Sequence, residues 1–513
     1  MGYYIELEGR VLEAIRRANL INYKPLHLFQ IKLVPFKLLE RASKINLQDK
    51  FCNISLQNPW FCLDKKYVYR KFTTGWKKFR VSFSDTYIDN SKRNRKIVSD
   101  AYNLCPKPKS KIFSDLCEKH YVAIRGYISG KNKIPLSTFL KSCHLLGFEP
   151  WKELDGCKFY SGSSDRSRFI VFKDKISPEL YILLNWLILE GNLDISRPTI
   201  SIYQNVGEHL CFKKLIKLFN EVFEVSPQFI KLQKFKTRPN ISSLVVSSAP
   251  LRQLLNLRYN IALGYKSREI KPNPFFNFDR ENILKILASE IETEGSFARH
   301  KKSKIIHCDV SFSTYSKDYS LSVFDEFKRL GYPVNFRTSR RNRFGVCEEE
   351  QRVTFWGVFE IQKFAFEIMP YFCHIGKIIN LLEVLKQGDF LKITRVDSNE
   401  DIKTLIQRAK NKCGSFKLLT QGLNADGLQI SHKAVEAWIH QSNNVSVYAI
   451  LKMCEVVGEK NYFNYLPKEL AFSLWIQGFV SRKNAEDIRG IENAYKHVED
   501  LIKYVGDRDR LVP

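Results

Sequence analysis

The feature that most restricts the fold of this chain is a pair of apolar helices that each end in Glu-Gly. One is the stretch 183–191 (LLNWLILEG) and the other is 287–295 (LASEIETEG). A glycine at this point suits the left-handed residue that stops many helices. The two acids, Glu190 and Glu294, are 294 minus 190, or 104, residues apart, about the length of one small α/β unit. Two such units packed through these helices would bring both carboxylates to the bottom of the interface.

The same order of elements follows both motifs, which predicts two related units. Hydrophobic periodicity and turn residues mark these elements. In the first unit we expect a strand and helix at 169–191, a strand at 197–204, a helix at 210–223, strands at 229–236 and 242–246, and a helix from 250. In the second we expect helix 279–294, strand 307–315, helix 319–330, strands 334–337 and 352–355, and helices from 358 and 374.

These motifs, and the repeated order around them, resemble the LAGLIDADG (dodecapeptide) homing endonucleases in their two-motif, single-chain form. The resemblance covers roughly residues 165–390. It implies an α+β fold with two pseudo-symmetric αββαββα-like units, 165–275 and 276–390, whose antiparallel sheets are saddle-shaped. It also implies a monomer, because both units belong to one chain.

Composition and charge agree with a nucleic-acid partner. The 513 residues carry 82 Lys and Arg against 54 Asp and Glu, a net charge of +28, which favours a polyanion. We expect no membrane-spanning segment and no signal peptide, and hence a cytoplasmic protein. The twelve cysteines form no close CxxC pairs, so we expect reduced thiols, many of them buried.

A second internal repeat lies outside these units. Residues 124–147 align without gaps to 435–458, with identities that include Asn132 and Asn443, Cys143 and Cys454, and Gly147 and Gly458. Both copies resemble helix-turn-helix domains of the phage-repressor type, with recognition helices at about 120–129 and 431–440. Copy two is less basic, and either reads bases weakly or only packs. We therefore expect a helix-turn-helix-like domain at 106–150 and a helical C-terminal domain with a polar tail at 395–513. Residues 1–105 form an α/β region of unknown role, with a strand pair at 67–84 that has one apolar and one cationic face.

The resemblance implies a site-specific, divalent-metal-dependent endonuclease that cuts double-stranded DNA. Glu190 and Glu294 would bind Mg²⁺ or Mn²⁺, together with the adjacent Gly191 and Gly295. Lys266 and Lys377 would neutralise charge in the transition state, and Gln204, with Thr314 as its counterpart, would position a water at the end of the first strand of its unit. The remaining motif acid, Glu292, is expected to be a surface residue.

Basic residues predict where DNA would bind. We expect the sheets to contact DNA through Lys and Arg on equivalent strand pairs, and the recognition helices to contact it as well. The predicted DNA-binding residues are Lys231, Lys234, Lys236, Arg238, Arg337, Arg340, Arg341, Arg343, Arg125, Lys131 and Lys433. Two alternatives stay open: a LAGLIDADG and helix-turn-helix transcription regulator that no longer cuts DNA, and an RNA maturase.

Overall fold

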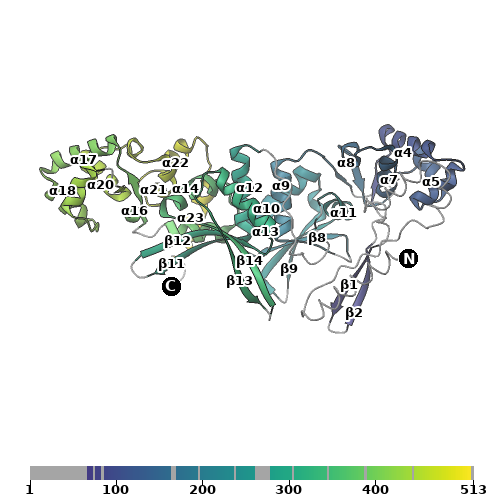
Figure 1. Ribbon diagram of the computed structural model, residues 1–513, viewed down its shortest axis with the longest axis horizontal. Coiled ribbons are helices and arrows are strands. Elements are labelled where there is room, and N and C mark those ends of the chain that lie inside the picture. Colours follow the sequence, from purple (N-terminus) through teal and green to yellow (C-terminus); the bar gives the residue numbers. More distant parts are fainter. Residues whose placement is uncertain are drawn as a thin grey trace. The chain divides into compact units, whose positions relative to one another are not determined.

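The computed structural model describes most of the chain from residue 66 onward. The described residues are 66–72, 75–81, 86–162, 169–194, 197–235, 238–259, 261, 278–302, 305–343, 346–385, 390–441 and 444–509, with the backbone alone at 66–81, 298–308, 341–348, 501 and 504–509. The chain is a mixed α+β protein with several small antiparallel sheets (Figure 1). It divides into an N-terminal half, residues 1–273 with 344–346, and a C-terminal half, residues 274–343 with 347–513.

The N-terminal half contains an αββαββα domain, which we call sheet domain one. Its elements are α9 (Pro178–Leu189), β7 (Gly191–Leu193), β8 (Thr199–Asn205), α10 (His209–Phe223), β9 (Ile230–Phe235), β10 (Arg238–Ser247) and α11 (Ala249–Leu257). The strands form an antiparallel sheet in the order β7-β8-β10-β9. The side chain of Ser177 caps α9 by accepting the N–H of Leu180 at 3.2 Å, and Pro178 occupies the first turn. Residues 180–189 of α9 are all buried, so this helix belongs to the core.

The C-terminal half contains a second domain of the same topology, sheet domain two. Its elements are α12 (Arg280–Glu294), β11 (Gly295–Lys302), β12 (Ile305–Thr314), α13 (Lys317–Arg329), β13 (Asn335–Arg343), β14 (Val346–Trp356) and α14 (Val358–Ile368). The sheet order β11-β12-β14-β13 repeats that of sheet domain one. In each domain the helices lie on one side of the sheet (Figure 1). The predicted order lacked one strand in each domain, because β7 and β11 begin at the motif glycine and have no apolar run of their own.

The internal repeat outside the sheet domains extends beyond the 24 residues aligned in the sequence, 124–147 and 435–458. Repeat one comprises β3 (Tyr87–Ile88), α4 (Lys92–Leu104), α5 (Lys109–Cys117), α6 (Tyr121–Ile128), β4 (Ile134–Pro135) and α7 (Leu136–Leu146). Repeat two has the same order, with β15 (Arg395–Asp397), α17 (Glu400–Cys413), α18 (Phe416–Ala425), α19 (His432–His440), β16 (Asn444–Ser446) and α20 (Val447–Val457). In both repeats the two strands pair antiparallel. The helices predicted at 120–129 and 431–440 are confirmed as α6 and α19.

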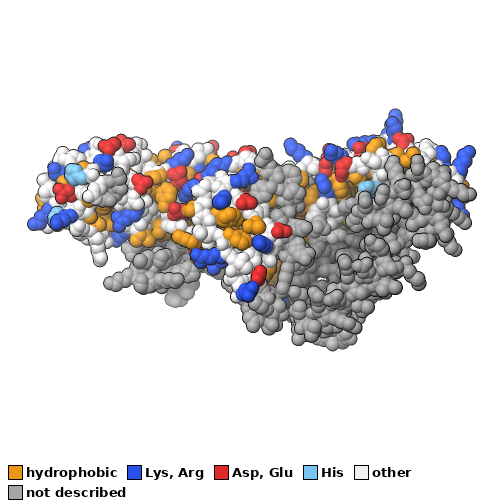
Figure 2. Space-filling view, in the orientation of Figure 1, with side chains coloured by type: hydrophobic (Ala, Val, Ile, Leu, Met, Phe, Trp, Pro, Cys, Tyr) orange, Lys and Arg blue, Asp and Glu red, His pale blue; other side chains and the backbone are white. Residues whose placement is uncertain are grey.

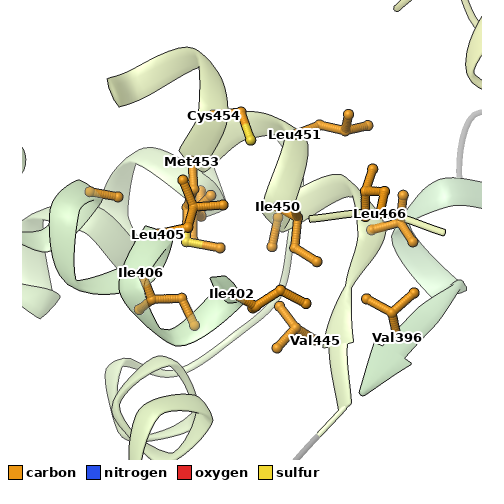
Figure 3. Close-up of a cluster of buried hydrophobic side chains, with 14 of the residues drawn as sticks. Val396, Ile402, Leu405, Ile406, Val445, Ile450, Leu451, Met453, Cys454 and Leu466 are labelled. Carbon is orange, nitrogen blue, oxygen red and sulfur yellow. The ribbon is translucent and has the colours of Figure 1, made fainter. Parts of the chain in front are cut away.

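Equivalent hydrogen bonds show that the two repeats share one scaffold. Leu136 N–H donates to the Thr86 carbonyl at 2.9 Å, and Val447 N–H donates to the Thr394 carbonyl at 3.0 Å. The last helix of each repeat ends at a glycine with positive φ, Gly147 or Gly458. Apolar side chains of α17 and α20 fill the core of repeat two, with Val445 packed beside them (Figure 3).

Each repeat is attached to the sheet domain in its own half. In the N-terminal half, β5 (Lys158–Tyr160) and β6 (Phe169–Val171) extend the sheet of repeat one, and Asp174, three residues after β6, forms an ion pair of 3.1 Å with Arg258 at the end of α11. The strand predicted before α9 is therefore present, but it pairs with repeat one. In the C-terminal half, Gln362 of α14 donates to the hydroxyl of Thr394 at 2.6 Å.

The polar C-terminal tail packs against the end of α14 in sheet domain two. Arg489 donates to the carbonyl groups of Phe366 and Glu367 at the end of α14, at 3.1 Å each, and the Tyr495 hydroxyl donates to the Phe366 carbonyl. Tyr495 is fully buried. These bonds satisfy carbonyl groups that the end of a helix leaves without partners, so the tail is part of the fold of the C-terminal half.

Three further expectations are tested by the described residues. The strand pair is present as β1 (Lys66–Phe72) and β2 (Gly75–Val81), but cationic residues occupy both alternating sets of positions, as the neighbours Arg70 and Lys71 show. The eight cysteines whose side chains are described are all free thiols, and all but Cys413 are buried. Within the described ranges, no helix combines the length and the apolar character that crossing a bilayer requires.

Candidate acid site and nucleic-acid interface

The two predicted acids occupy equivalent positions at helix-to-strand junctions. Glu190 is half-buried directly after α9, and Glu294 is the exposed last residue of α12. In each case the next residue begins the first strand of the sheet. The backbone therefore places each glutamate at one end of its sheet, at the same point of the topology.

The motif glycines are required for a reason other than the one expected from the sequence. Neither has a positive φ, and Gly295 has an extended backbone with φ −76° and ψ 158°. A Cβ atom on Gly191 would lie 2.6 Å from the Leu187 carbonyl oxygen, and one on Gly295 would lie 2.5 Å from that of Ile291. Each strand thus begins in contact with the last turn of the preceding helix, and only glycine allows this approach.

Lys377 lies next to the acid of motif two. Its ammonium group donates to the carbonyl of Gly295, the residue that follows Glu294. Lys377 belongs to α15 (Ile375–Leu385), more than 80 residues after the motif in sequence. The counterpart predicted for the first unit, Lys266, lies outside the described residues.

Glu292 holds the start of α15 against α12, so its expected place at the surface is wrong. Its side chain is fully buried. One carboxylate oxygen accepts the N–H groups of Cys373 and His374, the latter at 2.7 Å, and the other lies 3.4 Å from the Cys373 sulfur. Carboxylates at a helix start are stabilised by these N–H groups and by the helix dipole. The sequence motif placed this acid correctly on α12 but could not reveal a partner 81 residues away.

Gln204 and Thr314 are equivalent residues of the two sheets. Gly191 pairs with Ile202 and Gly295 pairs with Phe312, so each polar residue lies two positions beyond the partner of the motif glycine. Both lie on the second strand of their sheet rather than the first, because β7 and β11 precede them. The pleat places Gln204 on the same face of the sheet as Ile202.

The predicted cations of sheet domain one divide between the two faces of its sheet. Leu244 is fully buried under the helices and pairs with Leu232. The even-numbered residues of β9 and β10 in this register therefore face the helices. Lys234 belongs to that set, whereas Lys231 pairs with Val245 on the opposite face, which we call the open face. Both lysines are exposed. Arg238 is exposed at the start of β10, and Lys236 lies outside the described residues.

Sheet domain two divides its arginines in the same way. Arg337 lies on the open face, with its guanidinium carbon 5.6 Å from the ring centroid of Trp356. Arg340 lies on the other face, 3.5 Å from Glu349, in an exposed ion pair. Arg341 and Arg343 lie on β13, but their side chains are outside the described set.

The open face of sheet domain two also contains an arginine that the sequence prediction missed. Arg352 donates to the Ser311 hydroxyl at 3.1 Å and lies 3.8 Å from Asp309. Ser311 in turn shares a hydrogen bond of 2.8 Å with Ser296, two residues after Glu294. The alternation Arg352-Val353-Thr354-Phe355-Trp356 was the available signal, because it places Arg352 and Trp356 on one face.

The remaining predicted cations lie on the helical repeats. Arg125 and Lys131 of repeat one and Lys433 of repeat two are all exposed. On the face that Figure 2 shows, Lys and Arg side chains are spread over the described surface and do not form one continuous patch.

A buried pair of acids lies one helical turn before Glu294. Glu290 of α12 and Glu326 of α13 are both 1% exposed, and Tyr319 donates its hydroxyl to Glu290 at 3.3 Å. Burial, and next the adjacent Glu290 carboxyl, raise the pKa of Glu326 well above its usual value. Burial and the repulsion between two adjacent carboxylates both favour a protonated carboxyl in this pair.

No protein-family model and no curated protein sequence matches the chain. Among solved structures, a similar chain is that of the LAGLIDADG homing endonuclease I-GzeII in complex with its DNA target. The TM-score is 0.26 and the sequence identity is 11%, over 55% of this chain and 97% of that chain.

Proposed function

We propose that the protein is a divalent-metal-dependent, site-specific double-strand DNA endonuclease of the LAGLIDADG type, active as a monomer. The observation that carries this proposal is the equivalence of Glu190 and Glu294. Two domains with one topology each place a glutamate at the same helix-to-strand junction, before a glycine that must lack a side chain. A structural role alone would require the glycine but not the acid.

The donor chemistry around these acids fits a hard divalent cation. Mg²⁺ and Mn²⁺ prefer oxygen ligands, and each junction offers a carboxylate together with a glycine carbonyl. The Gly295 carbonyl also accepts a hydrogen bond from the Lys377 ammonium, which a bound metal would have to displace or share. Once bound, the metal would activate a water molecule and neutralise the charge on the leaving oxygen. Glu190 and Glu294, with the carbonyl groups of Gly191 and Gly295, are the proposed ligands.

Other residues of the chain have supporting roles in this proposal. Lys377 and Lys266 would stabilise negative charge on the phosphate, and Gln204 would orient water near its carboxylate. Lys231, Arg337 and Arg352 would contact DNA from the open faces, through phosphates or through guanine edges. Lys234 and Arg340 lie on the opposite faces of their sheets and would contribute only to the general attraction of DNA.

The test is the cleavage of a plasmid library of random target sites in the presence of Mg²⁺ or Mn²⁺. We expect Glu190→Gln and Glu294→Gln each to lower the cleavage rate by about 100-fold or more, because each removes a charge that the reaction requires. Glu281→Gln is the matched control, since it makes the same change at the exposed opposite end of α12 and should leave cleavage intact. Specific binding by the wild type without any cleavage would refute the nuclease and favour a transcription regulator. A preference for structured RNA would favour a maturase.

A further inference from the structure

The two helical repeats share one scaffold but present different chemistry on one helix. The ungapped match of 124–147 with 435–458 extends back to the residues that cap α6 and α19, His120 and Ser431. Each position of α6 thus has a counterpart 311 residues later. Because the buried residues and strand pairs correspond, differences on the exposed side of these helices are not imposed by the fold.

The exposed side of α6 combines apolar, aromatic and cationic groups. Tyr121 is 46% exposed and Val122 is 57% exposed, so both side chains are open to a partner. Arg125, one turn later, places its guanidinium carbon 5.7 Å from the Tyr121 ring centroid. His120 packs on the other side of the cluster, 4.6 Å from Tyr121 between centroids, and its Nδ1 accepts the N–H of Val122. These contacts hold the cluster in place before any partner binds.

The corresponding side of α19 is polar and has the opposite charge at one position. His432 replaces Tyr121, Lys433 replaces Val122, and Glu436 replaces Arg125. Lys433 and Glu436 are both exposed. Whereas α6 contains no acid, α19 carries a carboxylate in the centre of its exposed side.

We infer that repeat one reads base edges in the major groove of DNA through Val122 and Arg125, and that repeat two does not read bases with the equivalent surface. This inference rests on DNA as the partner in the proposed function, but not on cleavage. An α-helix with its side chains is about 10–12 Å wide and the major groove about 12 Å, so α6 fits there. An exposed branched apolar side chain matches the methyl group of thymine, and an arginine matches guanine. Exposed Lys131, just beyond α6, would contact a phosphate.

The chain offers a reciprocal exchange as the test. One variant gives α6 the surface of α19, with Tyr121→His, Val122→Lys and Arg125→Glu. The other gives α19 the surface of α6, with His432→Tyr, Lys433→Val and Glu436→Arg. Both variants and the wild type select binding sites from a random double-stranded DNA pool with Ca²⁺ in place of Mg²⁺. All six residues lie on helix surfaces, and circular dichroism confirms that each variant folds.

In one segment of the selected site, we expect the α6 variant to lose its discrimination between correct and wrong bases, which should fall by roughly 5- to 150-fold. The α19 variant should keep the wild-type preference in that segment. Within α6, Arg125→Ala should relax a single position, whereas Lys131→Ala should weaken binding to all sequences equally. Unchanged preferences in the α6 variant, or no sequence preference in the wild type, would overturn the inference. A protein that selects as expected but never cuts would refute only the nuclease, and one that cuts while its α6 variant selects normally would refute only this inference.

Discussion

The close approach at the motif glycines predicts a measurable cost for the smallest possible side chain. In Gly295→Ala the new Cβ would lie 2.5 Å from the Ile291 carbonyl oxygen and 2.7 Å from the Ile291 Cα, where ordinary contacts begin at 3.4 Å. Both are backbone atoms and cannot rotate away, so β11 must move from α12 by nearly 1 Å. Displacements of this kind cost about 1–3 kcal/mol. Gly191→Ala should behave in the same way against Leu187, because its contacts are 2.6 and 2.7 Å.

Amide hydrogen exchange measures this cost locally, which matters because the chain has several domains. In Gly295→Ala, protection of the amides of α12 and β11 should fall by roughly 5- to 150-fold, the equivalent of 1–3 kcal/mol. Under the proposed function, the same shift would slow cleavage by about 100-fold, because it displaces the Glu294 carboxylate. Gly207→Ala is the control, since no atom lies within 4 Å of its added Cβ and its φ is not positive. Equal protection in the two variants would show that the glycine contact is not rigid.

Three further results follow from single buried or exposed groups. The folded-state pKa of Glu326 is raised above its unfolded value, so folding takes up a proton at pH values between the two. Stability should be greatest below the ordinary carboxyl pKa and fall by up to roughly 1.4 kcal/mol per pH unit as pH rises toward the folded value. Glu326→Gln, which does not titrate, should flatten this dependence in urea unfolding across pH 4–8, and an unchanged slope would contradict the shared proton. Thr394→Val removes the hydroxyl that accepts from buried Gln362 and should cost about 1–3 kcal/mol by thermal unfolding; a neutral result would mean that the amide finds another acceptor. Gly422 is an exposed position of α18 with free space around an added Cβ, so Gly422→Ala should stabilise repeat two by about 0.5–1 kcal/mol, and a loss of thermal stability there would contradict that space.

Local sequence pattern predicted the parts of the fold that local physics determines. The cap at Ser177 and the apolar run after it define α9, and the cap at Asp279 defines α12. The strands β7 and β11 were missed because their first residue is a glycine that ends a helix, and a short polar strand has no hydrophobic alternation. Their presence is decided by pairing with β8 and β12, which are non-local contacts.

The candidate site shows the same division. Spacing and the Glu-Gly ending were enough to select Glu190 and Glu294, since both lie at the ends of helices. Glu292 was assigned to the surface because a single helix cannot show that another segment will donate two N–H groups to it. Lys231 and Lys234 were grouped by sequence proximity, yet residues three apart on a strand lie on opposite faces. The register that separates them was not readable from composition.

The modules of this chain are arranged as helical repeat, sheet domain, sheet domain, helical repeat. Copying a segment that held one module of each kind would have produced an alternating order instead. The order of modules is therefore not the one that a single tandem duplication of one helical repeat with one sheet domain would give.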